Sequence, residues 1–233
     1  MTEPYHGDLA KTGILFKLFE VSPEKRDESW QKVFLATVTE ASFACGDPQL
    51  IKGPDGFPYV HLITPEAEKE FQCFVIKHME QDFLLKEGFG IVINPAKEKP
   101  DWVFTYGDIV NLHLNKEYYS ERIDVVLPED ETLSTEQEVL IAQPSETYLP
   151  QLTRQVLKHY FELAKIENVK ILLMTRKTHE GVIQEIVFNL TPDKFENEVE
   201  YQKIMKDVSW FLPRHYFYSV MDEKEVSQYF RDL

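Results

Sequence analysis

The chain has 233 residues, of which 43% are hydrophobic and 13% aromatic, and this composition excludes a disordered protein. Its 40 acidic residues outnumber its 25 lysines and arginines, so the formal net charge is −15. A chain this acidic lacks the basic surface that neutralises phosphates, so the sequence disfavours nucleic acid and anionic membranes as partners.

The apolar pattern of the N-terminal half predicts a mixture of helices and strands. Trp30, Phe34 and Val38 recur at helical spacing, and the glycine and proline within 46–48 are expected to end that helix. Thr64 followed by a proline is typical of a helix start. In chain order the predicted elements are a helix over 27–45, a turn over 53–56, a strand over 57–63, a helix from 64, a buried strand over 88–95, a strand over 102–105 and a helix over 109–114 capped by Asp108.

An acidic stretch over residues 121–147 separates the two halves of the chain. It contains eight acidic residues against one basic residue, Arg122, and two prolines. Such a composition is typical of a linker or a long crossing segment, in which 139–141 is expected to form a short strand. The predicted organisation is an N-terminal α/β lobe over 1–120, an acidic crossing or linker over 121–147 and a C-terminal α+β lobe over 148–233.

The C-terminal half has a clearer pattern, which predicts a two-layer α/β sandwich around an antiparallel hairpin. In chain order the predicted elements are a helix over 149–166, a strand over 169–175, a hairpin loop over 177–181, a strand over 182–190, a helix over 198–211, a strand over 216–221 and a final helix from 222 through 230. The expected fold class is therefore α+β, with two lobes that each contain a small mixed sheet covered by helices.

Cofactor and metal motifs find little support. Gly88 and Gly90 have the spacing of a dinucleotide fingerprint, but they precede a predicted strand and position 93 is isoleucine. The seven histidines form no HxH or HExxH pair. His61, His113 and Asp108 would make a metal site if the fold brought them together, but a structural role for each is favoured. We therefore expect no cofactor and no metal.

Nucleophilic catalysis and export are also disfavoured. There is no G-x-S-x-G elbow, and neither Cys45 nor Cys73 belongs to a CxxC pair or has a basic neighbour. The first residues lack the pattern of a secretory signal, and no stretch reaches the about 18 apolar residues of a membrane helix. The sequence predicts a cytoplasmic protein with reduced thiols, no membrane contact and no catalytic residue.

Two segments are candidate binding surfaces. The first gathers Asn94, Trp102, Tyr106 and Asp108 at strand ends and turns, where binding groups are often presented, with His61 as a candidate neighbour. The alternative, which we favour for this segment, is that Trp102 packs into the core and Asp108 only caps a helix. The second surface is the aromatic run over 210–218, where exposed rings beside an arginine would suit a protein partner; its candidate residues are Trp210 and Arg214.

The order of these segments resembles a known family. The helix over 30–43, the segment Gly-Phe-Pro-Tyr-Val-His-Leu-Ile-Thr-Pro-Glu over 56–66 and Gly-Ile-Val-Ile-Asn-Pro over 90–95 resemble the N-terminal domain of the enhanced serine sensitivity (SseB-like) family. The segments at 149–150, 169–172, 210–213 and 229–230 are similar in layout to that family's second domain. The chain departs from the family at 63–65, where Ile-Thr-Pro stands in place of Phe-Thr-Ser. The resemblance implies two domains but no established activity, so it assigns no catalytic residue.

Three functions remain open at this point. The leading hypothesis is a non-enzymatic binding or regulatory module that acts through protein surfaces, with any small-molecule ligand unknown. One alternative is an enzyme of unrecognised type with a site near His61, Asn94, Tyr106 and Asp108. The other is an acidic inhibitor or immunity-type protein that caps a basic partner by charge complementarity. The net charge is −7 over 1–120, −7 over 121–147 and −1 over 148–233, which directs an electrostatic partner to the first lobe and the crossing.

Overall fold

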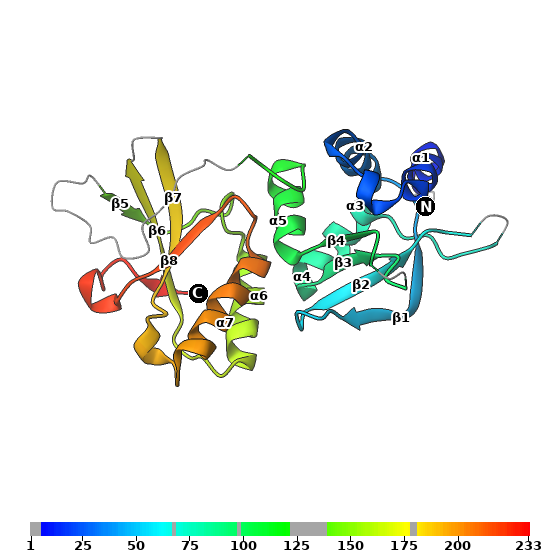
Figure 1. Ribbon diagram of the computed structural model, residues 1–233. Helices are drawn as coiled ribbons and strands as arrows, with labels where there is room; N and C mark the ends of the chain where they lie inside the picture. The colour runs from blue at the N-terminus through cyan, green and yellow to red at the C-terminus, as the bar shows by residue number, and fades with distance from the viewer. Residues whose placement is uncertain (1–5, 67–68, 97–98, 122–138, 178–180) are drawn as a thin grey trace, which may run out of the picture. The chain divides into compact units, whose positions relative to one another are not determined.

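The computed structural model describes residues 6–66, 69–96, 99–121, 139–177 and 181–233 (Figure 1). The chain divides into two compact units, Met1–Tyr118 and Tyr119–Leu233. The boundary falls between two neighbouring tyrosines. The Tyr118 ring is stacked on Phe104 of the first unit at 4.0 Å between centroids, whereas the Tyr119 ring lies against Arg214 of the second unit. Most of the predicted acidic crossing, 122–138, lies outside the described residues.

The described part of the first unit contains a four-stranded sheet in the order β1-β2-β3-β4. Its strands are β1 (Ala44–Lys52), β2 (Pro58–Ile63), β3 (Gly90–Ile93) and β4 (Trp102–Phe104). The central strands β2 and β3 run parallel, while β1 pairs with β2 and β4 with β3 in antiparallel fashion. Because β2 and β3 are parallel, their carboxyl ends lie at the same edge of the sheet, which is where open α/β sheets bind ligands.

Helices precede and follow these strands. They are α1 (Leu9–Glu20), α2 (Glu28–Val38), α3 (Ile76–Met79), a π-helical turn (Glu80–Leu84), α4 (Leu85–Glu87) and α5 (Tyr106–Asn115). Asp8 and Asp27 begin α1 and α2, because the Asp8 carboxylate accepts two backbone N–H groups of the first turn and the Asp27 carboxylate accepts one. Phe34 of α2 is fully buried, and its ring centroid lies 4.7 Å from that of Trp102 and 6.2 Å from that of Phe104. The second helix is thereby packed on β4.

The predicted helix over 27–45 is too long. The structure ends α2 at Val38, and the chain from Ala44 onward belongs to β1. The pairing of Ala44 with Ile63 and of Lys52 with Pro58 satisfies the backbone hydrogen bonds of this segment. The apolar residues after Val38 fit either a helix or a strand locally, so the partner strand decides between them.

The helix predicted from Thr64 and the predicted start of the helix after β4 also differ from the structure. No helix begins at Thr64, because the helical segment starts at Ile76. The first helix, α1, is absent from the predicted elements, since its apolar and polar residues are only weakly segregated. The turn at 53–56 and the strands β2, β3 and β4 are confirmed. The helix after β4 begins at Tyr106, earlier than expected, because Thr105 is its N-cap.

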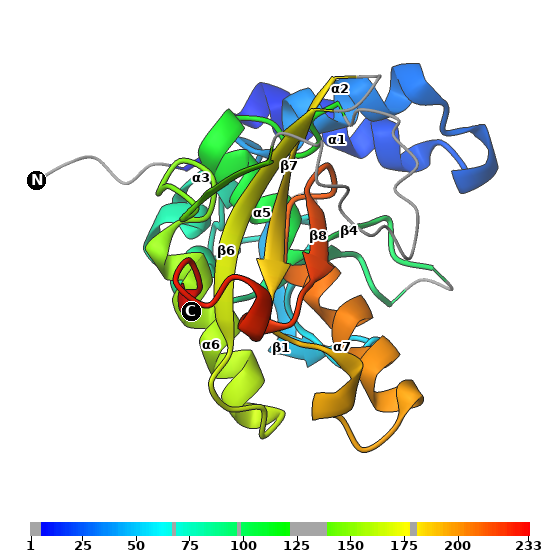
Figure 2. The same cartoon turned by 90° about the vertical axis from the view of Figure 1, so that its left-hand side faces the viewer.

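The second unit contains, in its described residues, a five-stranded sheet with the path β5-β6-β7-β8 and with β9 paired to β6 (Figure 2). The strands are β5 (Val139–Ala142), β6 (Lys170–Lys177), β7 (Val182–Phe188), β8 (Phe217–Val220) and β9 (Arg231–Asp232). The helices α6 (Gln151–Leu163) and α7 (Glu198–Phe211) lie behind the sheet in Figure 2. The Tyr218 hydroxyl of β8 donates to the Met205 carbonyl of α7, which joins the two layers. The expected two-layer α/β sandwich and the short strand at 139–141 are therefore present.

The final helix predicted for the second unit is wrong. A single 3₁₀ turn, Glu223–Glu225, stands at its start, and the chain then returns to the sheet as β9. Phe230 is 4% exposed and packs against Leu172, Met174 and Val187 on the face of the sheet opposite the helices. The described residues form no further helical layer on this face, so burial of Phe230 and pairing with β6 determine the conformation.

Candidate functional site

Two of the predicted binding residues lie in the interior of the first unit. Tyr106 and Asp108 have no exposed surface. The Tyr106 hydroxyl donates to the Leu85 carbonyl at 2.9 Å, and Asp108 forms a capping box with Thr105 at the start of α5. Asp108 takes part in the cap of a helix as expected, but as the third residue of α5, because Thr105 and not Asp108 is the N-cap. A ligand cannot reach either side chain in this structure, so the binding role expected for both is corrected to a structural one.

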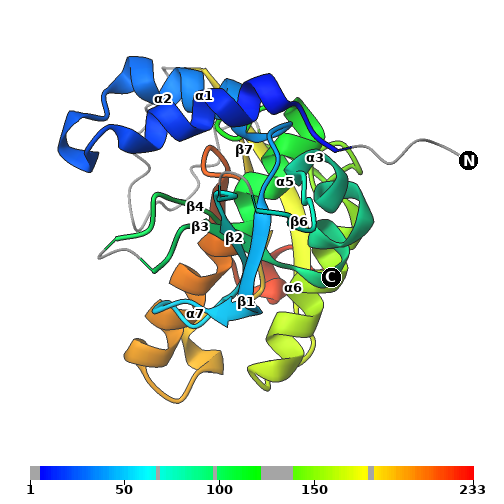
Figure 3. The same cartoon turned by 90° about the vertical axis from the view of Figure 1, so that its right-hand side faces the viewer.

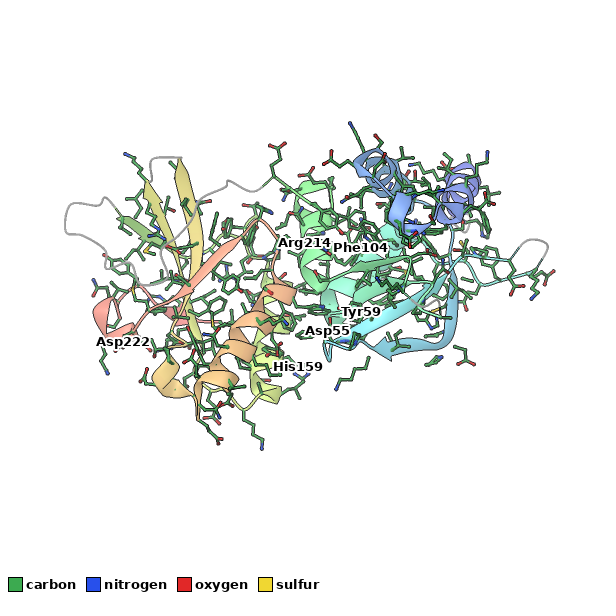
Figure 4. The ribbon with its side chains drawn as sticks, viewed as in Figure 1. Asp55, Tyr59, Phe104, His159, Arg214 and Asp222 are labelled. Carbon is green, nitrogen blue, oxygen red and sulfur yellow. The ribbon has the colours of Figure 1, made fainter. Side chains whose placement is uncertain are left out.

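The tryptophans of the predicted surfaces are also packing residues. Trp102 is partly buried, and its ring lies 5.8 Å from Trp30 in an aromatic cluster with Phe34. Trp210 is 6% exposed. Arg214, which Figure 4 labels, is exposed, and its guanidinium carbon lies 4.3 Å from the centroid of the Tyr119 ring. Of the two candidates in the run over 210–218, the structure presents Arg214 to solvent and places Trp210 in the interior.

His61 lies on β2 with its ring against the backbone of β1. Its Nδ1 is 3.1 Å from the Pro48 carbonyl oxygen, and its buried Nε2 has no hydrogen-bond partner among the described residues. The Cys45 thiol donates to the His61 carbonyl at 3.4 Å. Burial raises the pKa of the Cys45 thiol, which disfavours the nucleophilic thiolate. This pair therefore packs the hairpin and is not an activated dyad.

The histidines and acids considered for a metal site are not brought together. His113 lies on α5, where its Nδ1 is 2.7 Å from Oε1 of the buried Glu80. Asp108 is occupied by its cap, and His61 lies on a different element. Within the described ranges, no group of three or more His, Cys, Asp and Glu side chains is arranged to hold a metal ion.

Asn94 is the predicted residue that the structure places at a cavity. It follows β3 with a backbone φ of 52°, in the left-handed region that asparagine tolerates better than most residues. Its side-chain Oδ1 accepts the Thr64 N–H at 2.9 Å, and its Nδ2 donates to Thr64 Oγ1 at 2.8 Å and to Asp101 Oδ2 at 2.7 Å. These bonds join the carboxyl ends of β2 and β3.

A buried ion pair with Arg26 holds Asp101, the residue that accepts a hydrogen bond from Asn94. Arg26 Nη2 donates to Asp101 Oδ1 at 2.7 Å, and the two side chains are only 9% and 3% exposed. Arg26 also donates to the backbone carbonyls of Asp101 and Val21, and its guanidinium carbon lies 4.7 Å from the centroid of Trp30. Because the donor groups of this network have defined acceptors, Asn94 is positioned before any ligand arrives.

The cavity beside Asn94, which we call the strand-end pocket, has a volume of about 390 Å³. Its lining residues are Phe16, Phe19, Glu20, Ile63, Thr64, Asn94 and Ala96. Figure 3 shows α1, which supplies the first three, lying across the end of the sheet with α2 beside it. The walls are mostly aromatic and aliphatic, with polar groups from Glu20, Thr64 and Asn94. Such a mixture suits binding, since apolar walls supply affinity and a few fixed polar groups supply orientation.

Sequence reasoning misses the α1 side of this pocket. Thr64 and Asn94 each come before a proline that follows an apolar strand, and that signal draws attention to Asn94. Phe16, Phe19 and Glu20 carry no motif, and their helix is absent from the predicted elements. Their proximity to Asn94 arises only when α1 is packed against the sheet edge.

Two larger cavities among the described residues of the second unit have less suitable linings. One of about 550 Å³ is lined by residues at the end of α6 and at 232–233, including two lysines and three acids of opposing charge. The other, of about 500 Å³, lies beside β5 and includes the exposed Leu140 and Val182. The first lies at the edge of the sheet where the parallel strands β7 and β8 end, but no residue of either strand lines it, and the second lies at the opposite edge. The strand-end pocket is lined by the residues that directly follow two parallel strands, so it is the better candidate.

In the part of the chain that is described, no helix is both long and apolar enough to cross a membrane. Comparison of the chain with protein-family models, with curated proteins and with solved structures gave no match. The candidate site therefore stands on its own geometry.

Proposed function

We propose that this protein is a non-enzymatic binding module that recognises a protein partner through the strand-end pocket. The observation that carries the proposal is the fixed polar edge of an otherwise apolar cavity. Asn94 is oriented by Thr64 and Asp101, and Asp101 by the buried Arg26, so the edge costs little entropy to organise on binding. The exposed Phe16 completes the apolar wall and is reachable from solvent.

The enzyme alternative receives less support from the geometry. It required His61, Tyr106 and Asp108 to face a common site, but Tyr106 and Asp108 are fully buried. The likeness to SseB-like proteins stays a prediction, and the proposed pocket does not depend on it. A regulatory role would follow if occupancy of the pocket controlled the partner.

A selection from a random peptide-display library tests the proposal. We expect selected peptides to shift the backbone amide signals of Thr64 and Ala96 in a ¹⁵N-labelled sample of the whole chain. Phe16→Asp should weaken their binding about tenfold, because it places a charge in the apolar wall. The matched control is Leu163→Asp, which also replaces an exposed apolar helix residue by aspartate, but in the second unit.

The peptide selection has one outcome that supports the proposal and others that contradict it. Pocket-directed peptides that lose affinity with Phe16→Asp and keep it with Leu163→Asp support the proposal. Peptides that bind elsewhere, or a library that yields no binder to the whole chain, contradict it.

The second candidate function is the acidic inhibitor, which the net charge of −7 over 121–147 favours. It predicts a complex with a basic protein whose affinity falls steeply with salt and depends on residues 121–147 rather than on Phe16. Replacing the eight acids of that stretch by their amides, and measuring affinity for a basic test protein such as cytochrome c by calorimetry, distinguishes the two candidates. Unchanged affinity or absence of binding at low salt removes the inhibitor.

A further inference from the structure

The strand-end pocket is taken as the binding site proposed above, and the inference about its ligand rests on that proposed function. Some of its hydrogen-bonding groups are already paired within the protein, whereas others are free to bind a ligand. Both side-chain N–H groups of Asn94 are donated within the protein, to Thr64 and Asp101, and the Thr64 backbone N–H is donated to Asn94 Oδ1. What remains at the lining side chains is the second lone pair of Asn94 Oδ1, the Thr64 hydroxyl and the Glu20 carboxylate. Acceptors therefore predominate, and a ligand rich in donors is favoured.

Glu20 is the acceptor that carries a charge. It is exposed, it lines the pocket, and its carboxylate has no hydrogen bond or ion pair with any described residue. It is also the last residue of α1, where the helix dipole disfavours a carboxylate. Its position is thus unfavourable for the helix and open for a cation from outside.

Aromatic side chains flank this carboxylate. Phe16 and Phe19 line the same pocket, and aromatic faces attract cations in addition to supplying apolar surface. The first unit already holds a guanidinium in such surroundings. The Arg26 guanidinium carbon lies 4.7 Å from the Trp30 centroid and 5.8 Å from the Phe19 centroid, and its Nη2 donates to the Asp101 carboxylate.

The charge of the first unit acts in the same direction. Residues 1–118 contain 19 acids and 12 bases, a net charge of −7. A negative field attracts a basic partner and raises its rate of association.

We infer that the strand-end pocket takes a lysine or arginine side chain presented by the partner protein. The aliphatic stem lies between Phe16, Phe19 and Ile63, and the cationic head group pairs with the Glu20 carboxylate. The acceptor lone pair of Asn94 is available to a second N–H of the head group or of the adjacent backbone.

Four capped pentapeptides, Gly-Gly-X-Gly-Gly with X as arginine, lysine, norleucine or glutamate, test this inference. Each is titrated into the ¹⁵N-labelled whole chain while the amide signals of Thr64 and Ala96 are followed. Arginine and lysine peptides should bind about fivefold more tightly than the norleucine peptide, which keeps the stem but lacks the cation. The glutamate peptide should bind more weakly than norleucine.

Glu20→Gln and Glu24→Gln form the matched pair of variants. Both remove one exposed acid next to the same helix–turn segment, but Glu24 does not line the pocket. Glu20→Gln should reduce arginine and lysine binding to the norleucine level, whereas Glu24→Gln should leave the preference intact. Because Glu20 is exposed and lies at a helix C-terminus, its amide variant is expected to fold normally.

The results also separate this inference from the proposed function. If norleucine binds the pocket as tightly as arginine and Glu20→Gln changes nothing, the cation inference is wrong while the pocket remains a binding site. If no pentapeptide shifts the pocket amides but library peptides do so without a basic residue, the inference is again wrong and the proposed function stands. Failure of both the pentapeptides and the library removes both.

Discussion

Arg26 and Asp101 lie 75 residues apart in the chain, yet the Arg26 Nη2 donates to the Asp101 Oδ1 at 2.7 Å in the interior of the first unit. The pair connects the segment before α2 to the segment before β4, and Asp101 in turn orients Asn94. A single buried contact therefore links the helical pair to the edge of the sheet where the strand-end pocket lies.

Breaking this pair should strongly destabilise the first unit. Arg26→Met or Asp101→Asn leaves the other charge buried without its counter-ion, which costs about 3–5 kcal/mol. The double variant should recover part of that loss, since no buried charge remains. Urea unfolding followed by tryptophan fluorescence measures the free energy, with hydrogen exchange of β3 and β4 to localise the loss. The control is Glu66→Gln, which removes an ion pair with Lys69 that is 68% exposed on both sides and should change stability by under about 0.5 kcal/mol.

A result in which Arg26→Met costs no more than Glu66→Gln would show that the pair does not support the sheet edge. In that case Asn94 would need another explanation for its orientation.

Gly46 and His61 should show strong coupling. A Cβ at Gly46 would lie 2.2 Å from the His61 ring, so Gly46→Ala should cost about 1–3 kcal/mol through overpacking. His61→Ala removes the obstructing ring, and the double variant should therefore be more stable than the sum of the single changes predicts. Thermal unfolding of the four proteins gives the coupling free energy. Additive effects would contradict the close contact between the two residues.

Gly13 offers the opposite case. It is an exposed residue within α1, and a Cβ added to it would meet no heavy atom of the described residues within 4 Å, apart from its chain neighbours and the helix backbone. Gly13→Ala should stabilise the protein by about 0.5–1 kcal/mol, because alanine loses less backbone entropy in a helix. Urea unfolding measures the gain. A loss of stability would mean that α1 does not persist as a helix at this position.

Glu223 should make stability depend on acid pH in the second unit. Its hydrogen bond with Lys170, with a further one from Asn189, lowers the pKa of the Glu223 carboxyl below its ordinary value. A lowered folded-state pKa contributes stability that is present above the unfolded-state pKa and is lost as the pH falls through the folded-state value.

Comparison of the wild-type chain with Glu223→Gln checks this dependence. The wild-type chain should be more stable at about pH 6, and the difference should be smaller at about pH 3, because the pH has then fallen below the unfolded-state pKa. The readout is the urea concentration at which the amides of β6 lose half of their protection against hydrogen exchange. An equal difference at both pH values would exclude the ion pair as its cause.

Local sequence is sufficient to predict a helix or strand when the residues within and beside that element determine where it begins and ends. The helix α7, Glu198–Phe211, has the predicted bounds, because a proline follows its end and, in the structure, Asn197 caps its start. The strands β2, β3 and β6 are predicted because continuous apolar runs end in turn residues. Asn94 is singled out by the same kind of signal, since its position between a strand and a proline is legible in sequence.

Tertiary structure decides the elements whose local pattern is ambiguous. The segment from Ala44 becomes a strand because it pairs with β2, and the chain at Phe230 leaves the helix pattern because its ring is buried on the sheet. The same holds for the candidate site. Composition and turn chemistry determined an acidic two-unit α+β protein and drew attention to one residue of the proposed pocket, but the pocket depends on α1 packing against the ends of β2 and β3. Burial and pairing between distant segments supply that information, and no local pattern encodes them.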